Sequence, residues 1–411
     1  MIENIDKMNG WSIEELPNLV FFQEGPGVRN NQYTDSGVKL LNVANLKDGN
    51  VYLDNTDRYI SEEEAYGKYS HFLVDEGDLI IASSGIKVEY FDKKMGFAKK
   101  EHLPLCMNTS TIRFKTLDKD ILDIEYFAYF LKTNYFKKQI SRLITGSAQL
   151  NFGPSHLKQI KVILPPIETQ KKIVEVLDKA QELIDKRKEQ IEALDELVKS
   201  RFIEMFGDPV RNPKGWKIEK LENISSVGSS KRVFVDELVD EGIPFYRGTE
   251  IGALSTGEHI QPTLFITKEH YNSLKESTGV PVIGDLLMPS ICPDGRIWIV
   301  KDNQPFYFKD GRVLWIHLEE KNINSIYLKH MLREKFIRDY NKIASGTTFA
   351  ELKIFALKGL DISIPPIELQ NQFADFVNQI DKLKSQMEAG LKELEDNFNS
   401  LMQKAFKGEL F

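Results

Sequence analysis

Apolar residues recur with a seven-residue period in two long stretches of the chain. The first stretch runs from Pro165 to Phe206, and after its opening proline pair no glycine or proline interrupts it. A proline pair suits the first turn of a helix, and the Gly-Asp-Pro that follows Phe206 is typical of a helix end. About 40 residues at about 1.5 Å each predict a helix of roughly 60 Å. The second stretch, from Ile364 to Phe406, repeats this plan at an offset of 200 residues.

Both stretches place apolar residues at the a and d positions of one shared heptad register. Arg187, Arg201 and Lys384 are the exceptions. Such a seam predicts two long helices that pack together as an antiparallel coiled coil. The alternative is two unrelated amphipathic helices that cover separate cores, but the shared register favours pairing. The residues expected to form the helix-pairing seam are Ile173, Leu177, Ile184, Ile191, Leu194, Val198, Phe373, Val377, Ile380, Met387, Leu391, Leu394 and Phe398.

The residues before each long helix also repeat one plan. Gly10-Trp11 opens the first copy and Gly215-Trp216 the second, and Gly77-Asp78-Leu79 matches Gly284-Asp285-Leu286. Strand-like runs lie between clusters of Gly, Asn and Asp, and an aromatic-rich helical stretch follows them. In the first copy, the expected strands are 38–43, 78–82 and 111–115, and the expected helical stretch is 121–144.

We therefore predict an α+β fold with two similar domains, each a mixed sheet plus helices, separated by two long antiparallel coiled-coil helices. This order gives the chain an approximate two-fold, circular symmetry. Between the shared anchors the copies hardly agree, as expected for two recognition modules with different targets, or for drift after an old duplication. The expected boundaries are 1–164 for the first domain, 165–207 for the central long helix, 208–363 for the second domain and 364–411 for the C-terminal long helix.

Composition is that of a soluble globular protein. Of the 411 residues, 41% are hydrophobic and 28% are charged, and no apolar run approaches the roughly 18 residues of a membrane span. The two cysteines, Cys106 and Cys292, lie far apart and form no CxxC pair, which favours a reducing cytoplasm. The net charge of −7 comes mostly from the two helical stretches. If DNA is the target, domains this close to neutral need a partner that brings phosphate-binding charge.

Motifs of DNA-modifying and nucleotide-driven enzymes are missing from the sequence. Pro165-Pro166 and Pro365-Pro366 are each followed by Ile, so neither forms the [DNS]PP[YFW] loop of an adenine methyltransferase. A Gly-rich cofactor loop and a GxxxxGK[ST] phosphate loop are also missing. Pro293-Asp294 lacks the Glu-x-Lys of a nuclease, and the histidines show no metal-ligand spacing. We therefore expect no catalytic residue, metal site or cofactor in this chain, which disfavours a stand-alone DNA-modifying enzyme.

Side chains that could read DNA bases occur in the expected loops of both domains. Arg and Lys donate to guanine, Asn and Gln bind adenine, and small hydroxyls serve either. For any one of these residues a solvated loop position is the favoured alternative, so the groups weigh more than their members. In the first domain the candidates are Arg29, Asn30, Asn31, Ser83, Ser84, Lys87, Ser147 and Gln149. The candidate counterparts in the second domain are Ser229, Ser230, Lys231, Arg232, Arg247, Ser290 and Arg296.

One matched set of cations lies on expected helices. Lys138 and Arg142 correspond to Arg338 and Lys342 at the 200-residue offset, and each pair is spaced i, i+4 on one helix face. Like charges one turn apart repel mildly, so a polyanion is a natural partner, although a solubilising face is the equal alternative. On DNA such residues would contact phosphates and position the domain rather than read sequence.

With these residues in view, the chain resembles the specificity (S) subunits of type I restriction-modification systems. The resemblance spans nearly the whole length. It rests on two domains that open with Gly-Trp, two long helices that open with Pro-Pro-x-x-x-Gln, and the GSAQLNF stretch at Gly146–Phe152. The second copy of that stretch, GTTFAEL at Gly346–Leu352, matches more loosely because it lacks the Gln.

This resemblance implies a non-catalytic subunit that recognises double-stranded DNA and assembles a complex. Each target-recognition domain would read one half of an asymmetric bipartite target. The helical spine would dock two methyltransferase (M) subunits, which bind S-adenosylmethionine and methylate adenines, and would set the half-site spacing. Motor-nuclease restriction (R) subunits, which use ATP and magnesium, would cleave unmodified DNA. The remaining alternative is a protein-binding scaffold with two adaptor domains.

Overall fold

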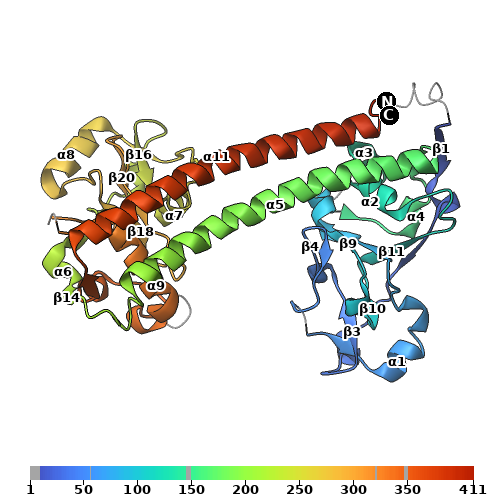
Figure 1. The fold of residues 1–411 in the computed structure, drawn as a ribbon, viewed down its shortest axis with the longest axis horizontal. Helices are drawn as coiled ribbons and strands as arrows, with labels where there is room; N and C mark the ends of the chain where they lie inside the picture. Colours follow the sequence, from blue (N-terminus) through green and yellow to red (C-terminus); the bar gives the residue numbers. More distant parts are fainter. Residues whose placement is uncertain (1–9, 56, 145–149, 320–321, 347–349) are drawn as a thin grey trace. The chain divides into compact units, whose positions relative to one another are not determined.

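A computed structural model describes residues 10–55, 57–144, 150–319, 322–346 and 350–411 of the chain (Figure 1). The chain divides into two compact units. The first unit is Met1–Arg187 together with Gly390–Phe411, and the second is Lys188–Ala389. Two long helices, α5 (Ile167–Phe206) and α11 (Ile367–Ala405), each contribute one end to each unit. The division between compact units therefore falls inside both helices and not at their ends.

Short strands of the first unit form a central antiparallel sheet and a smaller mixed sheet. They are β1 (Ser12–Glu15), β2 (Val20–Glu24), β3 (Val38–Leu41), β4 (Leu46–Lys47), β5 (Asn50–Val51), β6 (Tyr59–Ile60), β7 (Leu79–Ala82), β8 (Ser84–Ile86), β9 (Met95–Phe97), β10 (Leu105–Met107), β11 (Thr111–Thr116), β12 (Leu150–Asn151) and β13 (Lys161–Leu164). The central sheet has the order β2-β11-β7-β9. In the mixed sheet, β10-β3-β6, strand β10 runs parallel to β3 and β6 antiparallel. Strand β1 pairs with β13, directly before α5.

The second unit repeats these three pairings. Its strands are β14 (Lys217–Lys220), β15 (Ser226–Gly228), β16 (Ile243–Tyr246), β17 (Phe265–Ile266), β18 (Leu286–Pro289), β19 (Trp298–Ile299), β20 (Tyr307–Phe308), β21 (Val313–His317) and β22 (Asp361–Ile364). The orders β15-β21-β18-β19, β17-β16-β20 and β14-β22 match those of the first unit, including the parallel pair β16–β20. The predicted α+β fold with two similar domains of mixed sheet plus helices is therefore confirmed.

The shorter helices differ between the units where the sequences differ. They are α1 (Glu62–Tyr66), α2 (Ile124–Lys132), α3 (Asn134–Leu143), α4 (Pro154–Leu157), α6 (Leu221–Ile224), α7 (Gly248–Ser255), α8 (Lys268–Thr278), α9 (Ser325–Ile343) and α10 (Ile354–Lys358). The helical stretch expected at 121–144 is present as two helices, α2 and α3. Thr133 adopts extended backbone angles and its hydroxyl accepts from the Phe136 N–H, which ends α2 and starts α3. In the second unit α9 continues past this level and kinks later, at Asp339.

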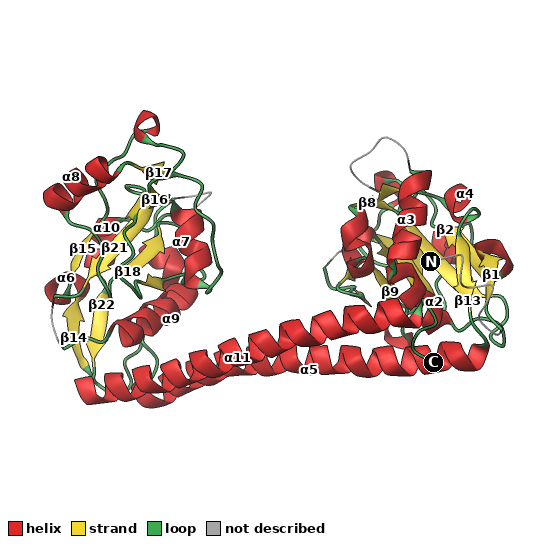
Figure 2. Ribbon diagram, turned by 90° about the horizontal axis from the view of Figure 1, so that it is seen from above, coloured by secondary structure: helices red, strands yellow, loops and turns green. Residues whose placement is uncertain are grey.

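In each unit the sheets and shorter helices lie against the long helices (Figure 2). The main core of each unit combines its central sheet, several shorter helices and both long helices. In the first unit, Tyr126 on α2 stacks on Phe406 with ring centroids 5.1 Å apart, and its hydroxyl donates to the Ile163 carbonyl at 2.8 Å. Ile173 and Leu177 of α5 lie in the same core as the end of α11. The start of one long helix thus packs beside the end of the other, so the two helices are antiparallel.

The second unit contains the equivalent contacts. Tyr327 on α9 contacts Phe206 at 4.7 Å between ring centroids, and its hydroxyl donates to the Ser363 carbonyl at 2.8 Å. Phe206 also lies 5.5 Å from the ring of Phe373 near the start of α11. In each unit a tyrosine and a phenylalanine therefore join the domain to the ends of the two long helices.

A buried glutamine fixes the start of each long helix. Gln170 and Gln370, the last residue of each Pro-Pro-x-x-x-Gln motif, are fully buried. The Oε1 of Gln170 accepts from the Asp123 N–H, and its Nε2 donates to the carbonyls of Ile121 and Pro165. Gln370 makes the matching bonds to the loop before α9 and to the Pro365 carbonyl. Because an unpaired buried amide is costly, these bonds hold the domain and its helix in one geometry.

All predicted seam side chains are buried or half-buried. The three charged exceptions have local explanations. Arg187 lies over Gly390, where a Cβ would come within 2.6 Å of the guanidinium, so glycine makes room for it. Lys384 pairs with Asp195 at 2.7 Å, and Arg201 lies over the ring of Phe376.

Candidate nucleic-acid interface

The candidate base-reading residues of the first domain differ widely in exposure. Arg29, Asn30 and Asn31 are exposed at a single 3₁₀ turn, Asn30–Gln32, in which the Gln32 side chain accepts from the Arg29 N–H. Lys87 is exposed and Ser84 half-buried, whereas Ser83 is buried, so we do not retain Ser83 as a base contact. Ser147 and Gln149 lie outside the described residues.

In the second domain, several candidates are held by neighbouring groups. The hydroxyls of Ser229 and Ser230 donate to the backbone carbonyls of Val313 and Phe308. Ser290 is buried and is not retained. Lys231 is exposed. The ion pairs of the three arginines are Arg232 with Asp310 at 3.1 Å, Arg247 with Glu250 at 2.7 Å and Arg296 with Asp294 at 2.8 Å.

The structural counterpart of Arg29 is Phe234, which corrects the match to Ser229–Arg232. Phe234 precedes the equivalent 3₁₀ turn, Val235–Glu237, and its N–H donates to the Glu237 side chain at 2.7 Å. The exposed turn is therefore polar and cationic in the first domain and apolar and acidic in the second. Unequal loop lengths concealed this correspondence in the sequence.

The cations on α3 and α9 are neutralised to different degrees. Lys138 and Arg142 are exposed, and neither forms an ion pair within the described part of the chain. Arg338, by contrast, pairs with Asp208 at 2.5 Å and with Glu334 at 3.5 Å. Lys342 pairs with Asp339 at 2.6 Å across the kink of α9.

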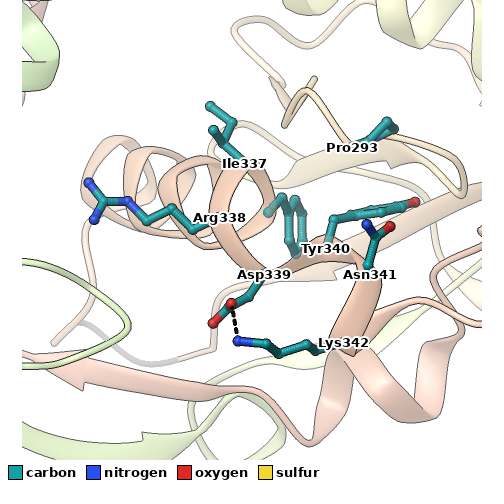
Figure 3. Close-up of a pocket in the computed structure, with 8 residues that line it drawn as sticks. Pro293, Ile337, Arg338, Asp339, Tyr340, Asn341 and Lys342 are labelled. Carbon is teal, nitrogen blue, oxygen red and sulfur yellow. Dashed lines mark hydrogen bonds and ion pairs between the residues drawn. The ribbon is translucent and has the colours of Figure 1, made fainter.

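The kink itself opens a hollow of about 340 Å³ that is lined by Pro293 and by residues 336–342 (Figure 3). The Arg338 side chain extends away from the helix, whereas the Lys342 side chain reaches back to Asp339, and the dashed line marks this pair. The second-domain helix therefore presents less unpaired positive charge than the first.

Two further side-chain networks, missed in the sequence, lie where the central strands end. In the second domain the Glu351 carboxylate accepts from the Ser290 hydroxyl at 3.0 Å and pairs with Lys353 at 2.5 Å and Arg312 at 3.4 Å. These partners, Lys353 first, lower the pKa of Glu351, so it stays ionised. The Arg312 side chain is 64% exposed and that of Lys353 54%.

The first domain has neutral amides in the corresponding region. Asn108 is buried, accepts from the Val28 N–H and donates to the Asn42 side chain at 3.0 Å. Asn151, next to the buried Ser83, is exposed. The Ser83 hydroxyl is buried without a hydrogen-bond partner among the described residues. In the sequence, the Lys-Asp-Gly-Arg turn at 309–312 was a signal for the second-domain network alone.

The described residues contain neither a metal-binding cluster nor a reactive thiol. No cluster of three or more His, Cys, Asp or Glu side chains that could hold a metal occurs there. Burial raises the pKa of both Cys106 and Cys292 to about 12, so neither thiol is an activated nucleophile. Within the same residues, every helix is too short or too polar to cross a bilayer.

The fold and these surfaces define a class of proteins with two similar α+β domains, each completed by the ends of two long antiparallel helices. The chain belongs to the family described as the type I restriction modification DNA specificity domain, which matches it twice, at residues 10–194 and 213–396. The resemblance to specificity subunits is confirmed.

Individual proteins that are similar to this chain are also type I specificity subunits or belong to type I systems. The chain is 26% identical to S.HindORF215P of Haemophilus influenzae, an inferred type I restriction enzyme specificity subunit. That alignment spans 60% of this chain and 63% of the relative. The StySPI specificity subunit of Salmonella potsdam is 23% identical over 98% of this chain and 89% of its own. A solved chain of a type I R-M system, from a study of complex assembly and conformational transition, shares the fold with a TM-score of 0.60 at 16% identity. The match covers 98% of this chain and 99% of that one.

Proposed function

We propose that the chain is the DNA-recognition and assembly subunit of a type I restriction-modification complex. In this proposal each domain reads one half of an asymmetric bipartite double-stranded target. The observation that carries it is a repeated framework with unlike surfaces. Strand order, aromatic joints and glutamine bonds recur in both units, whereas the exposed turn carries Arg29-Asn30-Asn31 in one and Phe234-Val235-Asp236 in the other. A conserved framework with different contact residues is what two readers of different sequences need.

Partner subunits would supply the chemistry and the remaining charge. We place S-adenosylmethionine on two methyltransferase subunits, and ATP and magnesium on motor-nuclease subunits. One exposed leucine at the matching position of each long helix supports two equivalent docking positions. Leu183 is 55% exposed on α5, and Leu383, at the 200-residue offset, is 42% exposed on α11. Neither residue belongs to the helix-pairing seam, so both are available to a partner.

The decisive experiment maps methylated bases in DNA that has been exposed to the chain, with and without a co-expressed methyltransferase partner. We expect adenine methylation in a bipartite motif only when both proteins are present. The chain alone, incubated with labelled S-adenosylmethionine, should transfer no methyl group. Methyl transfer by the isolated chain, or an unchanged motif when this chain is replaced by another specificity subunit, would overturn the proposal.

The helix cations give a second test, because the two domains differ in free charge. We expect Lys138→Gln with Arg142→Gln to weaken DNA binding by the assembled complex about equally for all sequences. The slope of log affinity against log salt should fall by up to about two, since each lost phosphate contact removes about 0.9. The matched double variant of Arg338 and Lys342 should change the slope less, because acids already neutralise both residues. Fluorescence anisotropy across a salt series measures both slopes, and equal changes would contradict the expectation.

A further inference from the structure

Three positions are structurally equivalent in the two domains because matching hydrogen bonds fix them, two through backbone groups alone and one through a backbone N–H and a side chain. The N–H of Ser83 donates to the carbonyl of Ser110, and the N–H of Ser290 donates to that of Arg312, both at 2.9 Å. Ser110 and Arg312 therefore occupy one position, which we call position A.

The backbone carbonyls of the same two serines define the second equivalence. The Ser83 carbonyl accepts from the Phe152 N–H at 3.0 Å, and the Ser290 carbonyl accepts from the Leu352 N–H at 2.7 Å. The residues before these donors, Asn151 and Glu351, occupy position B.

A capping bond defines the third equivalence. The Asn42 N–H donates to the Asn45 side chain at 2.8 Å, and the Arg247 N–H donates to the Glu250 side chain at 2.9 Å. Asn42 and Arg247 therefore occupy position C. It lies beside position A, because a Cβ on the next residue, Gly248, would be 3.4 Å from the Arg312 carbonyl.

At these three positions the framework is constant while the chemistry changes from neutral to charged. The first domain carries Ser110, Asn151 and Asn42. The second carries Arg312, Glu351 and Arg247 in their places. Bonds between backbone groups hold positions A and B, so a change of side chain there leaves these bonds in place. Surface positions of this kind are suited to carry sequence specificity.

The second-domain side chains are also prepared for a ligand. The Glu351 carboxylate accepts from the Ser290 hydroxyl, and the Arg312 Nη1 donates to the same carboxylate at 3.4 Å. Glu250 holds Arg247 in the same way, at 2.7 and 3.2 Å. A braced guanidinium loses less rotamer freedom on binding, and its planar fork fits the O6 and N7 acceptors of guanine. An asparagine amide has the donor and acceptor that fit adenine.

We propose that positions A, B and C form the base-reading edge of each domain. In the second domain, Arg312 reads a guanine and Glu351 is its positioning residue. In the first domain, Asn151 reads an adenine. This inference rests on the proposed function, since it assigns the contacts by which the two half-sites are distinguished.

The test is methylation mapping with the assembled complex of this chain and its methyltransferase partner, on a library of random duplexes. We expect Arg312→Ala to relax one guanine position of one half-site, with a roughly 5- to 150-fold loss of discrimination there and no change in the other half-site. Asn151→Ala should relax one adenine position of the other half-site. Glu351→Gln, which can still accept from Ser290, should relax the same position as Arg312→Ala, by less.

Control variants separate reading from folding and from bulk charge. Arg312→Lys keeps the charge and the pairing with Glu351 but loses the fork, so it should assemble normally and still relax the guanine position. Lys275→Ala, an exposed cation on α8 of the same unit, should leave the motif unchanged. Two results for the Arg312→Ala complex would overturn the inference and leave the proposed function intact. One is methylation of the parent motif with undiminished discrimination at every position. The other is weaker binding to all sequences with an unchanged base preference. If the parent complex itself shows no bipartite motif, the proposed function fails first and the inference fails with it.

Discussion

Inserting seven residues into both long helices, after Glu189 and Ala389, should lengthen the unread gap between the two half-sites by up to three base pairs. One heptad keeps the apolar seam in phase and adds about 10 Å at about 1.5 Å per residue. Duplex DNA rises about 3.4 Å per base pair, so about 10 Å corresponds to about three pairs. The half-site sequences should not change, because no residue of either globular part is altered.

These insertion points respect the contacts along the seam. Arg187 lies over Gly390 within the first unit, and Lys384 pairs with Asp195 within the second. With insertions after Glu189 and Ala389, the two partners of each contact stay in the same unit, so both contacts can still form. Methylation mapping of the assembled variant measures the gap. A heptad placed in α5 alone is the control and should impair assembly, because it shifts one helix against the other. An active double-insertion variant with an unchanged gap would show that the helices do not set the spacing.

Truncation of the aromatic joints should destabilise one unit at a time. Phe206 and Phe406 are each 3% exposed and fill the space between a domain tyrosine and the long helices. Replacing either by alanine should cost about 3–5 kcal/mol of unfolding free energy, as for other buried phenylalanines. Phe411→Ala, at a side chain 58% exposed, should change stability by less than about 0.5 kcal/mol.

The two substitutions should also act in different places. Phe206 belongs to the core of the second unit and Phe406 to that of the first. Limited proteolysis with mass spectrometry should therefore find new cleavage within Lys188–Ala389 for Phe206→Ala and outside it for Phe406→Ala. Identical cleavage patterns would contradict the assignment of one aromatic joint to each unit.

The long helices were predictable from sequence because a heptad repeat is a local pattern that burial directly enforces. Their charged exceptions were not, since the pairing of Lys384 with Asp195 depends on which turns of the two helices face each other. The break at Thr133 was also hidden. Threonine is a favoured N-cap residue but also occurs inside helices, and only the surrounding structure decides between the two positions.

The candidate interface was predictable by region but not by residue. Strand ends and turns were found, yet Ser83 and Ser290 turned out to be buried because they continue the central strands inward. Arg312 was missed because its contact with Glu351 joins two residues that are distant in sequence. The match of Arg29 to Phe234 required backbone bonds that unequal loop lengths conceal. Contacts between distant segments are set by strand pairing, which one sequence does not display.

The division of the chain into units also has a consequence for its biosynthesis. The second unit, Lys188–Ala389, is one continuous segment, whereas the first needs Gly390–Phe411 to complete its core. On a ribosome that adds about 5–20 residues per second, the remaining stretch of about 220 residues takes roughly 10–45 s to synthesise. During that time the apolar face of α5 around Ile173 and Leu177 is not yet covered by Ala405 and Phe406, which are the last buried residues of this core to be synthesised. The domain that is made first is therefore finished last, and its uncovered face is the one for which a chaperone would compete.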